Sequence, residues 1–335
     1  MVATSKLEFS MLCEFRNPPG WERPFRERYY DAIDHIVWVE EIGFDCIYFT
    51  EHHFADDDYL TAPLLNATIV ADRTKRIKIA TCVLLLPLYN PVRLAEEGAF
   101  IDQLSEGRYE LGFGTGYMAK EYAGYGIDWK TRGKRTDEMV EIIRRLWTED
   151  SVTFHGEHFQ IEKASLRPKP VQRPCPPIWV GGFVKAVHRR AAKFGDGLLI
   201  GVDVVSEFAS YQAELAALGK DPATAKASGG HQWTYVSDDP ERTWDIIAPY
   251  VMYHIDAYAR WGQEFFPRLS TKEELRATGM LRVLTPEAMI GEIRDLQSKI
   301  NLARHQFFMN PGGIPLELMR EPIECFAKKV IPAFR

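Results

Sequence analysis

Short apolar, β-branched runs alternate with amphipathic helical stretches along nearly the whole chain, and this pattern constrains the fold more than any other feature. Repeated strand–helix units of this kind build a parallel sheet covered by helices. We expect eight strands, at 7–12, 44–50, 76–86, 108–116, 177–182, 196–201, near 231–236 and at 304–310. Eight such units fit a (β/α)8 TIM barrel, and a doubly wound open sheet of six or seven strands is the alternative.

The 335 residues are expected to form a single domain, 1–335, because the strand–helix rhythm resumes after each interruption. One interruption, near 148–176, is rich in proline and alternates polar with apolar residues. We expect it to be an insertion that contains a small hairpin. A second interruption, near 262–284, is irregular and could form a lid. The predicted domain is therefore a barrel with insertions in its βα loops.

The composition argues against several classes of protein. Forty-one Lys and Arg against 47 Asp and Glu give a net charge of -6, which disfavours nucleic acid as a partner. No apolar run reaches the roughly 18 residues that a membrane helix needs, and the start does not resemble a signal peptide. Five scattered cysteines without a CxxC pattern are typical of buried free thiols. We therefore expect a soluble, cytoplasmic protein without a membrane partner.

The run from Glu51 to Asp58 contains two adjacent histidines and follows the second predicted strand, at the end where barrels carry their active sites. Neighbouring residues of an extended chain point to opposite faces, so His52 and His53 are poorly placed to bind one metal ion. A single imidazole at the barrel mouth suits acid–base chemistry. The aspartates 56–58 are typical of a solvated turn. We predict no metal site here.

Glycines follow two other predicted strands. The run from Gly112 to Tyr117 has the spacing G-x-G-x-G and leads into a polar, aromatic loop, unlike the dinucleotide fingerprint that opens a helix. Either a flat ring or a neighbouring strand that approaches the backbone closely would explain it. The pair Gly181 and Gly182 precedes a helix start, where backbone N–H groups could bind a phosphate.

Together these motifs resemble the bacterial luciferase-like family of flavin-dependent monooxygenases. The resemblance rests on residues 43–54, 77–97, 101–128, 135–147, 176–182 and 191–197. It implies a (β/α)8 barrel with reduced FMN across its mouth, the FMN being reduced by a separate NAD(P)H-dependent reductase. In such enzymes reduced flavin adds oxygen to give a C4a-hydroperoxide, which oxygenates a small organic substrate. Residues 206–284 match no motif of the family, and substrate selection is expected there.

The resemblance also implies roles for individual residues. His52 would handle a proton beside the flavin, and Glu51 would set the orientation or tautomer of His52. A non-prolyl cis peptide bond is expected between Cys82 and Val83, under the flavin ring. The remaining positions would border the ring and ribityl chain (Gly114, Thr115, Gly116, Tyr117) or the phosphate (Gly181, Gly182, Phe183, Val184).

The sequence departs from the luciferase pattern at two of these positions. Luciferase-type proteins have a cysteine and an arginine where Gly114 and Thr115 stand. The departure argues against light emission as the activity. It also leaves the counter-charge of the phosphate unassigned, with Arg93, Arg132, Arg135 and Arg189 as the candidates.

Other functions stay open at this point. An F420-dependent reductase, which transfers hydride without oxygen, is the alternative on the same barrel. A barrel that binds flavin without catalysis is an alternative of another class, and a metal-dependent hydrolase is opposed by the absence of His-x-His after the first strand. A homodimer is expected from the resemblance alone. A pocket that tolerates ring-shaped substrates is predicted from the aromatic loop residues Phe15, Trp21, Phe54, Tyr89, Tyr117, Tyr122, Trp129 and Trp233.

Overall fold

The computed structural model describes residues 6–201, 203–230, 232–263 and 265–335. Eight parallel strands form its central sheet, in the order β3-β2-β1-β13-β10-β9-β8-β5, and β5 also pairs with β3. The sheet is thereby closed, so the (β/α)8 barrel is confirmed and the open doubly wound sheet is wrong. The eight strands are β1 (Glu8–Cys13), β2 (Cys46–Phe49), β3 (Lys78–Thr81), β5 (Tyr109–Gly114), β8 (Ile178–Gly181), β9 (Gly197–Leu199), β10 (Ala227–Gly229) and β13 (Leu302–Phe308).

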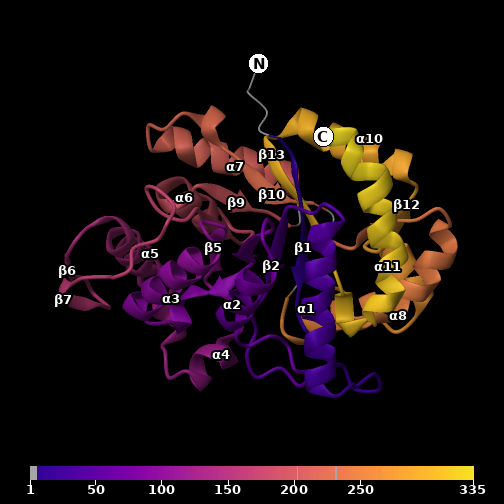
Figure 1. Cartoon of the computed structure of the whole chain (residues 1–335), viewed down its shortest axis with the longest axis horizontal. Helices are drawn as coiled ribbons and strands as arrows, with labels where there is room; N and C mark the ends of the chain where they lie inside the picture. Colours follow the sequence, from indigo (N-terminus) through magenta and orange to yellow (C-terminus); the bar gives the residue numbers. More distant parts are fainter. Residues whose placement is uncertain (1–5, 202, 231, 264) are drawn as a thin grey trace.

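Helices connect successive strands and cover the outside of the barrel (Figure 1). The longer ones are α1 (Phe25–Glu41), α2 (Pro63–Arg73), α3 (Pro91–Leu104), α5 (Arg132–Thr148), α6 (Lys185–Phe194), α7 (Val204–Ala217), α8 (Pro240–Arg260), α10 (Pro286–Lys299) and α11 (Leu316–Cys325). Several begin at residues that favour the start of a helix. Pro91 occupies the first turn of α3, and the Asn90 side chain accepts hydrogen bonds from the backbone N–H groups of Val92 and Arg93.

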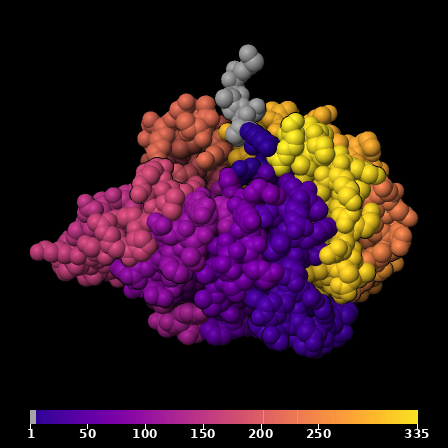
Figure 2. All heavy atoms as spheres, in the orientation of Figure 1, coloured from indigo at the N-terminus to yellow at the C-terminus, as the bar shows by residue number. Residues whose placement is uncertain are grey.

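The strands are buried on both faces because one face lines the barrel interior and the other packs on the helices. All six residues of β5 and all four of β2 are buried. Pairing of β13 with β1 brings the two ends of the chain together, and the C-terminal segment lies against the N-terminal one on the surface (Figure 2).

Two predicted strands differ from the observed ones. The seventh barrel strand is β10, whereas the predicted segment 231–236 contributes β11 (Thr234–Val236), which pairs with β12 (Arg282–Leu284) outside the barrel; position 231 lies outside the described residues. The three residues of β10 are Ala, Ser and Gly, and a Cβ on Gly229 would lie 2.6 Å from the Ile200 carbonyl oxygen. Small residues fit this crowded position, but a run of Ala, Ser and Gly lacks the apolar, β-branched pattern of a strand and is read as a loop from the sequence.

The third predicted strand is also interrupted. After β3 the peptide bond between Cys82 and Val83 is cis, and β4 (Leu84–Leu85) continues along β5. The short helix η1 (Leu86–Leu88) follows. The chain thus turns at the barrel mouth one residue after β3.

Two insertions stand out from the barrel. The antiparallel hairpin of β6 (Val152–His155) and β7 (Gln160–Ala164) projects from one side of the molecule (Figures 1 and 2). After α8, residues 265–284 form an irregular stretch, the short helix α9 (Lys272–Thr278) and β12. A further short helix, α4 (Ala119–Gly124), follows β5 at the mouth.

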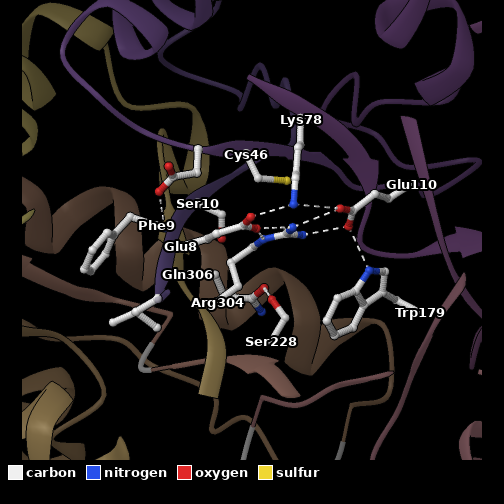
Figure 3. Close-up of polar contacts among 12 residues, drawn as sticks. Glu8, Phe9, Ser10, Cys46, Lys78, Glu110, Trp179, Ser228, Arg304 and Gln306 are labelled. Atoms are coloured by element: carbon white, nitrogen blue, oxygen red, sulfur yellow. Dashed lines mark hydrogen bonds and ion pairs between the residues drawn. The ribbon is translucent and has the colours of Figure 1, made fainter. Parts of the chain in front are cut away.

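A network of charged side chains fills the barrel near the amino-terminal ends of its strands (Figure 3). Arg304 of β13 donates to Glu8 Oε2 of β1 and to both carboxylate oxygens of Glu110 of β5, at 2.5 to 3.1 Å. Glu110 also accepts the indole N–H of Trp179 at 2.8 Å. Burial by itself would raise the pKa of Glu110, but the charge and hydrogen bonds of Arg304, together with Lys78 and the Trp179 N–H, outweigh burial and lower the pKa to about 2. We call these residues, with Lys78 of β3, the lumen network.

Candidate functional site

A cavity of about 390 Å³ opens at the carboxyl-terminal ends of the strands. This is the end at which barrel enzymes carry their active sites. Every site residue expected from the sequence lines it: Glu51, His52, Cys82, Val83, Gly114, Thr115, Gly116, Tyr117, Gly181, Gly182, Phe183 and Val184. Residues more than 130 positions apart in the chain are therefore brought to one surface by the closure of the barrel.

His52 is buried at this cavity and held between two polar side chains. Its Nδ1 lies 2.9 Å from Glu121 Oε1, and its Nε2 lies 3.3 Å from the Tyr117 hydroxyl. Burial keeps the pKa of Tyr117 well above its ordinary value, so the phenol is protonated and donates to Nε2. His52 then carries its own proton on Nδ1 and donates it to the Glu121 carboxylate. Nε2 is thereby the acceptor nitrogen of the ring, and its donor Tyr117 also lines the cavity.

The expectation that Glu51 orients His52 is wrong, because Glu121 of α4 does so. Glu51 instead accepts hydrogen bonds from His53 Nε2 at 3.1 Å, from Leu85 N at 2.5 Å and from the Tyr89 hydroxyl at 2.5 Å. Alternation along an extended chain explains why Glu51 contacts His53 and not His52, since the side chains of residues 51 and 53 share one side and that of residue 52 lies on the other. The partner of His52 must then come from another element. Glu121 lies in a polar loop sequence, which gives no sign that this carboxylate is buried.

The second histidine and the aspartates do not line the cavity. His53 lies between Glu51 and the Tyr125 hydroxyl, which is 3.2 Å from its Nδ1. Asp56 and Asp58 are exposed, as a solvated turn requires. Asp57 is different: it is buried, pairs with Arg16 Nη1 at 2.5 Å and accepts the Tyr253 hydroxyl at 2.9 Å. The interpretation as a solvated turn is therefore wrong for this carboxylate.

Arg16 was not singled out by the sequence, yet it supports the wall beside His52. It is fully buried, and its guanidinium carbon lies 4.6 Å from the ring centre of Tyr59, 5.1 Å from Tyr258 and 4.5 Å from Trp261. Glu14 pairs with Arg16 Nε at 3.0 Å. Burial raises the pKa of Glu14 to about 7.

Aromatic side chains form the wall of the cavity around His52. The ring centres of Tyr59, Tyr117 and Tyr258 lie 4.9, 5.3 and 6.0 Å from that of the imidazole, and all three residues line the cavity. Gln263, Phe265, Phe266 and Phe308 extend the wall toward the rim. Of this aromatic wall, only Tyr117 was expected from the sequence. Gln263, Phe265 and Phe266 follow α8, within the segment 206–284 where the sequence by itself offered no recognisable motif.

Glycines form the opposite wall, and their neighbour is Val83. A Cβ on Gly114 would lie 2.8 Å from Val83 Cγ2, and one on Gly181 would lie 2.4 Å from Val83 Cγ1. These two positions are therefore restricted to glycine by a side chain that follows the cis peptide bond. Close packing of the chain on itself accounts for Gly114 and Gly181 without a ligand.

One end of the cavity is suited to an anion. Val184 is the N-cap of α6 and its side chain makes no capping hydrogen bond, so the first amides of the helix are not capped by it. Arg132, at the start of α5, lines the same cavity and stacks on Trp129, its guanidinium carbon 3.7 Å from the ring centre. Arg190 of α6 donates to the Gly133 carbonyl at 3.2 Å, which holds the two helix starts together. A phosphate would meet uncapped amides and a cation here.

The three other candidate arginines lie elsewhere. Arg93 is exposed on α3 and pairs with Glu97 at 2.7 Å. Arg135 donates to the Pro87 carbonyl at 2.9 Å and lies over the Phe159 ring. Arg189 lines a separate groove on the outer side of α6. Among the four arginines considered, Arg132 is the one that the structure brings to the cavity.

A family model for luciferase-like monooxygenases matches residues 7–293. The chain belongs to the luciferase-like monooxygenase family. The fold is similar to that of the solved structure of the monooxygenase RslO1 of Streptomyces bottropensis, which superposes with a TM-score of 0.84 at 22% identity, covering 98% of this chain and 100% of that one.

Curated relatives of this luciferase-like protein differ in their cofactor. The oxygenase component of the flavin-dependent trigonelline monooxygenase of Acinetobacter baylyi is 31% identical over 172 residues, 51% of this chain and 48% of that protein. The F420-dependent glucose-6-phosphate dehydrogenase of Amycolatopsis mediterranei is 33% identical over 176 residues, 50% of this chain and 52% of that protein. The chain spans about half the length of the first curated relatives it matches. Other relatives are FMNH2-dependent or F420-dependent enzymes.

No group of three or more His, Cys, Asp or Glu side chains in the described part is arranged to hold a metal ion. Within the same ranges, no helix is both long and apolar enough to cross a membrane.

Proposed function

We propose that this luciferase-like protein is a flavin-dependent monooxygenase, which uses reduced FMN and oxygen to oxygenate a small organic substrate. The observation that carries the proposal is that His52, paired with the buried Glu121, lines the same cavity as Arg132 and the uncapped start of α6. An acid–base group and an anion site thus face one space. A cofactor with a flat ring and a phosphate fits this arrangement.

The residues present fit FMN along the length of the cavity. Val83, Leu85, Gly114 and Gly181 would lie along the flat ring, and Arg132 with the first amides of α6 would bind the phosphate. When bound, reduced flavin supplies the electrons that activate oxygen, which side chains alone cannot do. The protein contributes the shape of the site and the position of one acid–base group.

His52 is proposed as that acid–base group. Its Nε2 accepts a hydrogen bond from Tyr117, and both residues line the cavity. Glu121 holds the proton of Nδ1 and would stabilise the imidazolium when Nε2 takes up a second proton. Glu51 lines the cavity, but its carboxylate already accepts hydrogen bonds from three donors within the protein. We therefore propose that Glu51 holds the loop after β2 against Leu85 and Tyr89.

We further propose a separate NAD(P)H-dependent reductase as the source of reduced FMN, in the cytoplasm where NAD(P)H is available. The relative from Acinetobacter baylyi is an oxygenase component, which supports a separate reductase.

A homodimer through α2 and α3 is also proposed. Leu65 and Ile69 of α2 and Phe100 and Leu104 of α3 are exposed on two helices that pack side by side. Light scattering of the purified chain tests the dimer.

Anaerobic titration with reduced FMN, followed by the fluorescence of Trp129 and the other tryptophans, tests the assignment of the cofactor. We expect saturable binding, and Arg132→Gln should weaken it by about tenfold because a charge-assisted contact to the phosphate is lost. Arg93→Gln is the matched control, since Arg93 pairs with Glu97 away from the cavity, and it should leave the affinity unchanged. Equal affinity of the Arg132 variant would contradict the assignment.

An F420-dependent reductase is the second candidate, because a relative with this cofactor is 33% identical to the chain. The two candidates differ in their need for oxygen. Product formation that depends on oxygen and reduced FMN supports the monooxygenase. Saturable binding of F420 with oxygen-independent turnover, and no binding of FMN, would replace it with the reductase.

A further inference from the structure

We propose that the substrate of this site is a hydroxylated aromatic ring, and that His52 removes the proton of its phenolic hydroxyl. The inference rests on the proposed monooxygenase function and deepens it by naming the substrate class. Three observations carry it: the rings that surround His52, the Glu121 carboxylate behind it, and the hydroxyl and amide groups in front of it.

The first observation is the shape of the space beside His52. Tyr59, Tyr117 and Tyr258 present their rings to the imidazole at centre distances of 4.9 to 6.0 Å, at steep angles of 64° to 79°. Farther out, Phe183 and Phe265 form an edge-to-face pair at 5.8 Å on the rim. Aromatic walls of this kind prefer a flat ring, which they contact by stacking and by edge-to-face packing.

The second observation is the pairing of His52 with a buried carboxylate. Glu121 is fully buried, its Oε1 accepts from His52 Nδ1 and from the His53 backbone N–H, and its Oε2 has no hydrogen-bond partner among the described residues. A carboxylate that accepts the Nδ1 proton fixes the tautomer of the imidazole and leaves Nε2 as its acceptor nitrogen. A site that only had to bind a neutral ring or chain would gain nothing from this costly burial.

The third observation is what faces a hydroxyl bound at His52 Nε2. The Tyr117 hydroxyl already lies 3.3 Å from Nε2, and Gln263 lines the same cavity. Burial keeps the pKa of Tyr117 high, so this phenol donates a hydrogen bond and does not compete for the proton. A substrate hydroxyl that replaces the Tyr117 hydroxyl as the partner of Nε2 would give its proton to Nε2, and the freed Tyr117 hydroxyl would donate to the negative charge that remains.

The proposed step balances in protons and electrons. The O–H bond of the phenol breaks, its proton moves to His52 Nε2, and the electron pair stays on the substrate as a phenolate, which makes the ring electron-rich. The overall reaction consumes one O2 and one reduced flavin. One oxygen atom enters a C–H bond of the ring as a new hydroxyl, and the other leaves as water.

Ionisation of a bound phenol can be measured without turnover. The probe is 4-nitrophenol, whose anion absorbs visible light, added to protein saturated with oxidised FMN and read as a difference spectrum across pH. We expect the apparent pKa of the bound probe to lie about 1 unit or more below that of the free probe, because His52 and Tyr117 favour the anion. In His52→Ala and Glu121→Gln this shift should vanish, while 4-nitroanisole, which has no hydroxyl, should bind all three proteins alike.

Two tyrosine variants form a matched pair for the same measurement. Tyr117→Phe removes the hydroxyl that faces His52 and should reduce the shift, whereas Tyr125→Phe removes the hydroxyl that faces His53 and should leave it unchanged. Should Glu121→Gln fail to fold, His52→Asn gives the same test at the base itself.

Three outcomes would overturn the proposal: an unshifted probe in the wild type, a shift that survives in His52→Ala, or decanal bound at least tenfold more tightly than both nitroaromatic probes. The FMN titration distinguishes failure of the phenolic substrate from failure of the proposed flavin-dependent function. Normal FMN binding with an unshifted probe refutes the phenolic substrate alone, and absence of FMN binding refutes the proposed function.

Discussion

The barrel holds a buried polar group near each end of its strands, and the two groups differ in how completely they are paired. In the lumen network, Arg304 donates hydrogen bonds to Glu8, Glu110 and Tyr48. Glu110 also accepts a hydrogen bond from the Trp179 indole. At the mouth, one oxygen of Glu121 has no partner in the described part of the chain, and His52 Nε2 has a single 3.3 Å contact, to Tyr117.

This difference follows from what each group can contact. The lumen network is enclosed by strands β1, β2, β3, β5, β8 and β13, so every charge meets a neighbour from another strand. A buried ion pair of this kind is costly to break and fixes the arrangement of the elements that carry it. The mouth is bounded by loops and opens to a cavity. One buried carboxylate oxygen here, Glu121 Oε2, has no partner among the described residues, and such an unpaired acceptor costs stability.

The largest effect is expected from breaking the lumen network. Arg304→Met removes one partner of two carboxylates and should lower the free energy of unfolding by about 3 to 5 kcal/mol. Urea or guanidinium unfolding measures it. Lys78→Met, at the half-exposed edge of the same network, is the control and should cost about 1 kcal/mol or less. A similar loss in both variants would mean that the pairing of Arg304 does not set the stability of the barrel.

A second test uses pH. The folded-state pKa of Glu110, about 2, lies below the ordinary value, so its stabilisation is present above the unfolded pKa and is lost as pH falls toward 2. The loss amounts to about 3 kcal/mol between pH about 5 and 2. The unfolding free energy of Glu110→Gln should therefore fall less over this range. Glu96→Gln, at an exposed carboxyl, should fall as the wild type does.

The smallest effect on stability and a clear effect on turnover are expected at the mouth. His52→Ala should lower oxygen-dependent turnover by about 100-fold or more, which is about 2.7 kcal/mol of activation free energy, because one acid–base group is lost. FMN binding should be retained, since the phosphate end is separate. Unfolding and FMN titration are the parallel measurements. Wild-type turnover would remove His52 from the mechanism, and a stability loss as large as that of Arg304→Met would erase the contrast between the two ends.

The sequence predicted the barrel because the alternation of strands and helices can be read directly from the order of apolar and polar residues. It also predicted which loops meet at the mouth, because the carboxyl ends of parallel strands lie at the same end of the barrel. It misplaced the seventh strand, since the crowded position of β10 requires small residues that look like a loop. It also identified His52 and the glycines of the opposite wall, although the reason for Gly114 and Gly181 is the Val83 side chain.

The sequence by itself determined the repeating fold, the family, and the short list of residues around the cavity, because each is encoded in local order and spacing. Only the tertiary structure decided the partnerships. Whether Glu51 or Glu121 meets His52, whether Asp57 is solvated or paired with Arg16, and which arginine reaches the cavity all depend on distances between elements far apart in the chain. The "EHH" segment shows the division: alternation sends His52 to the cavity, and the fold supplies Glu121 from α4 to complete it.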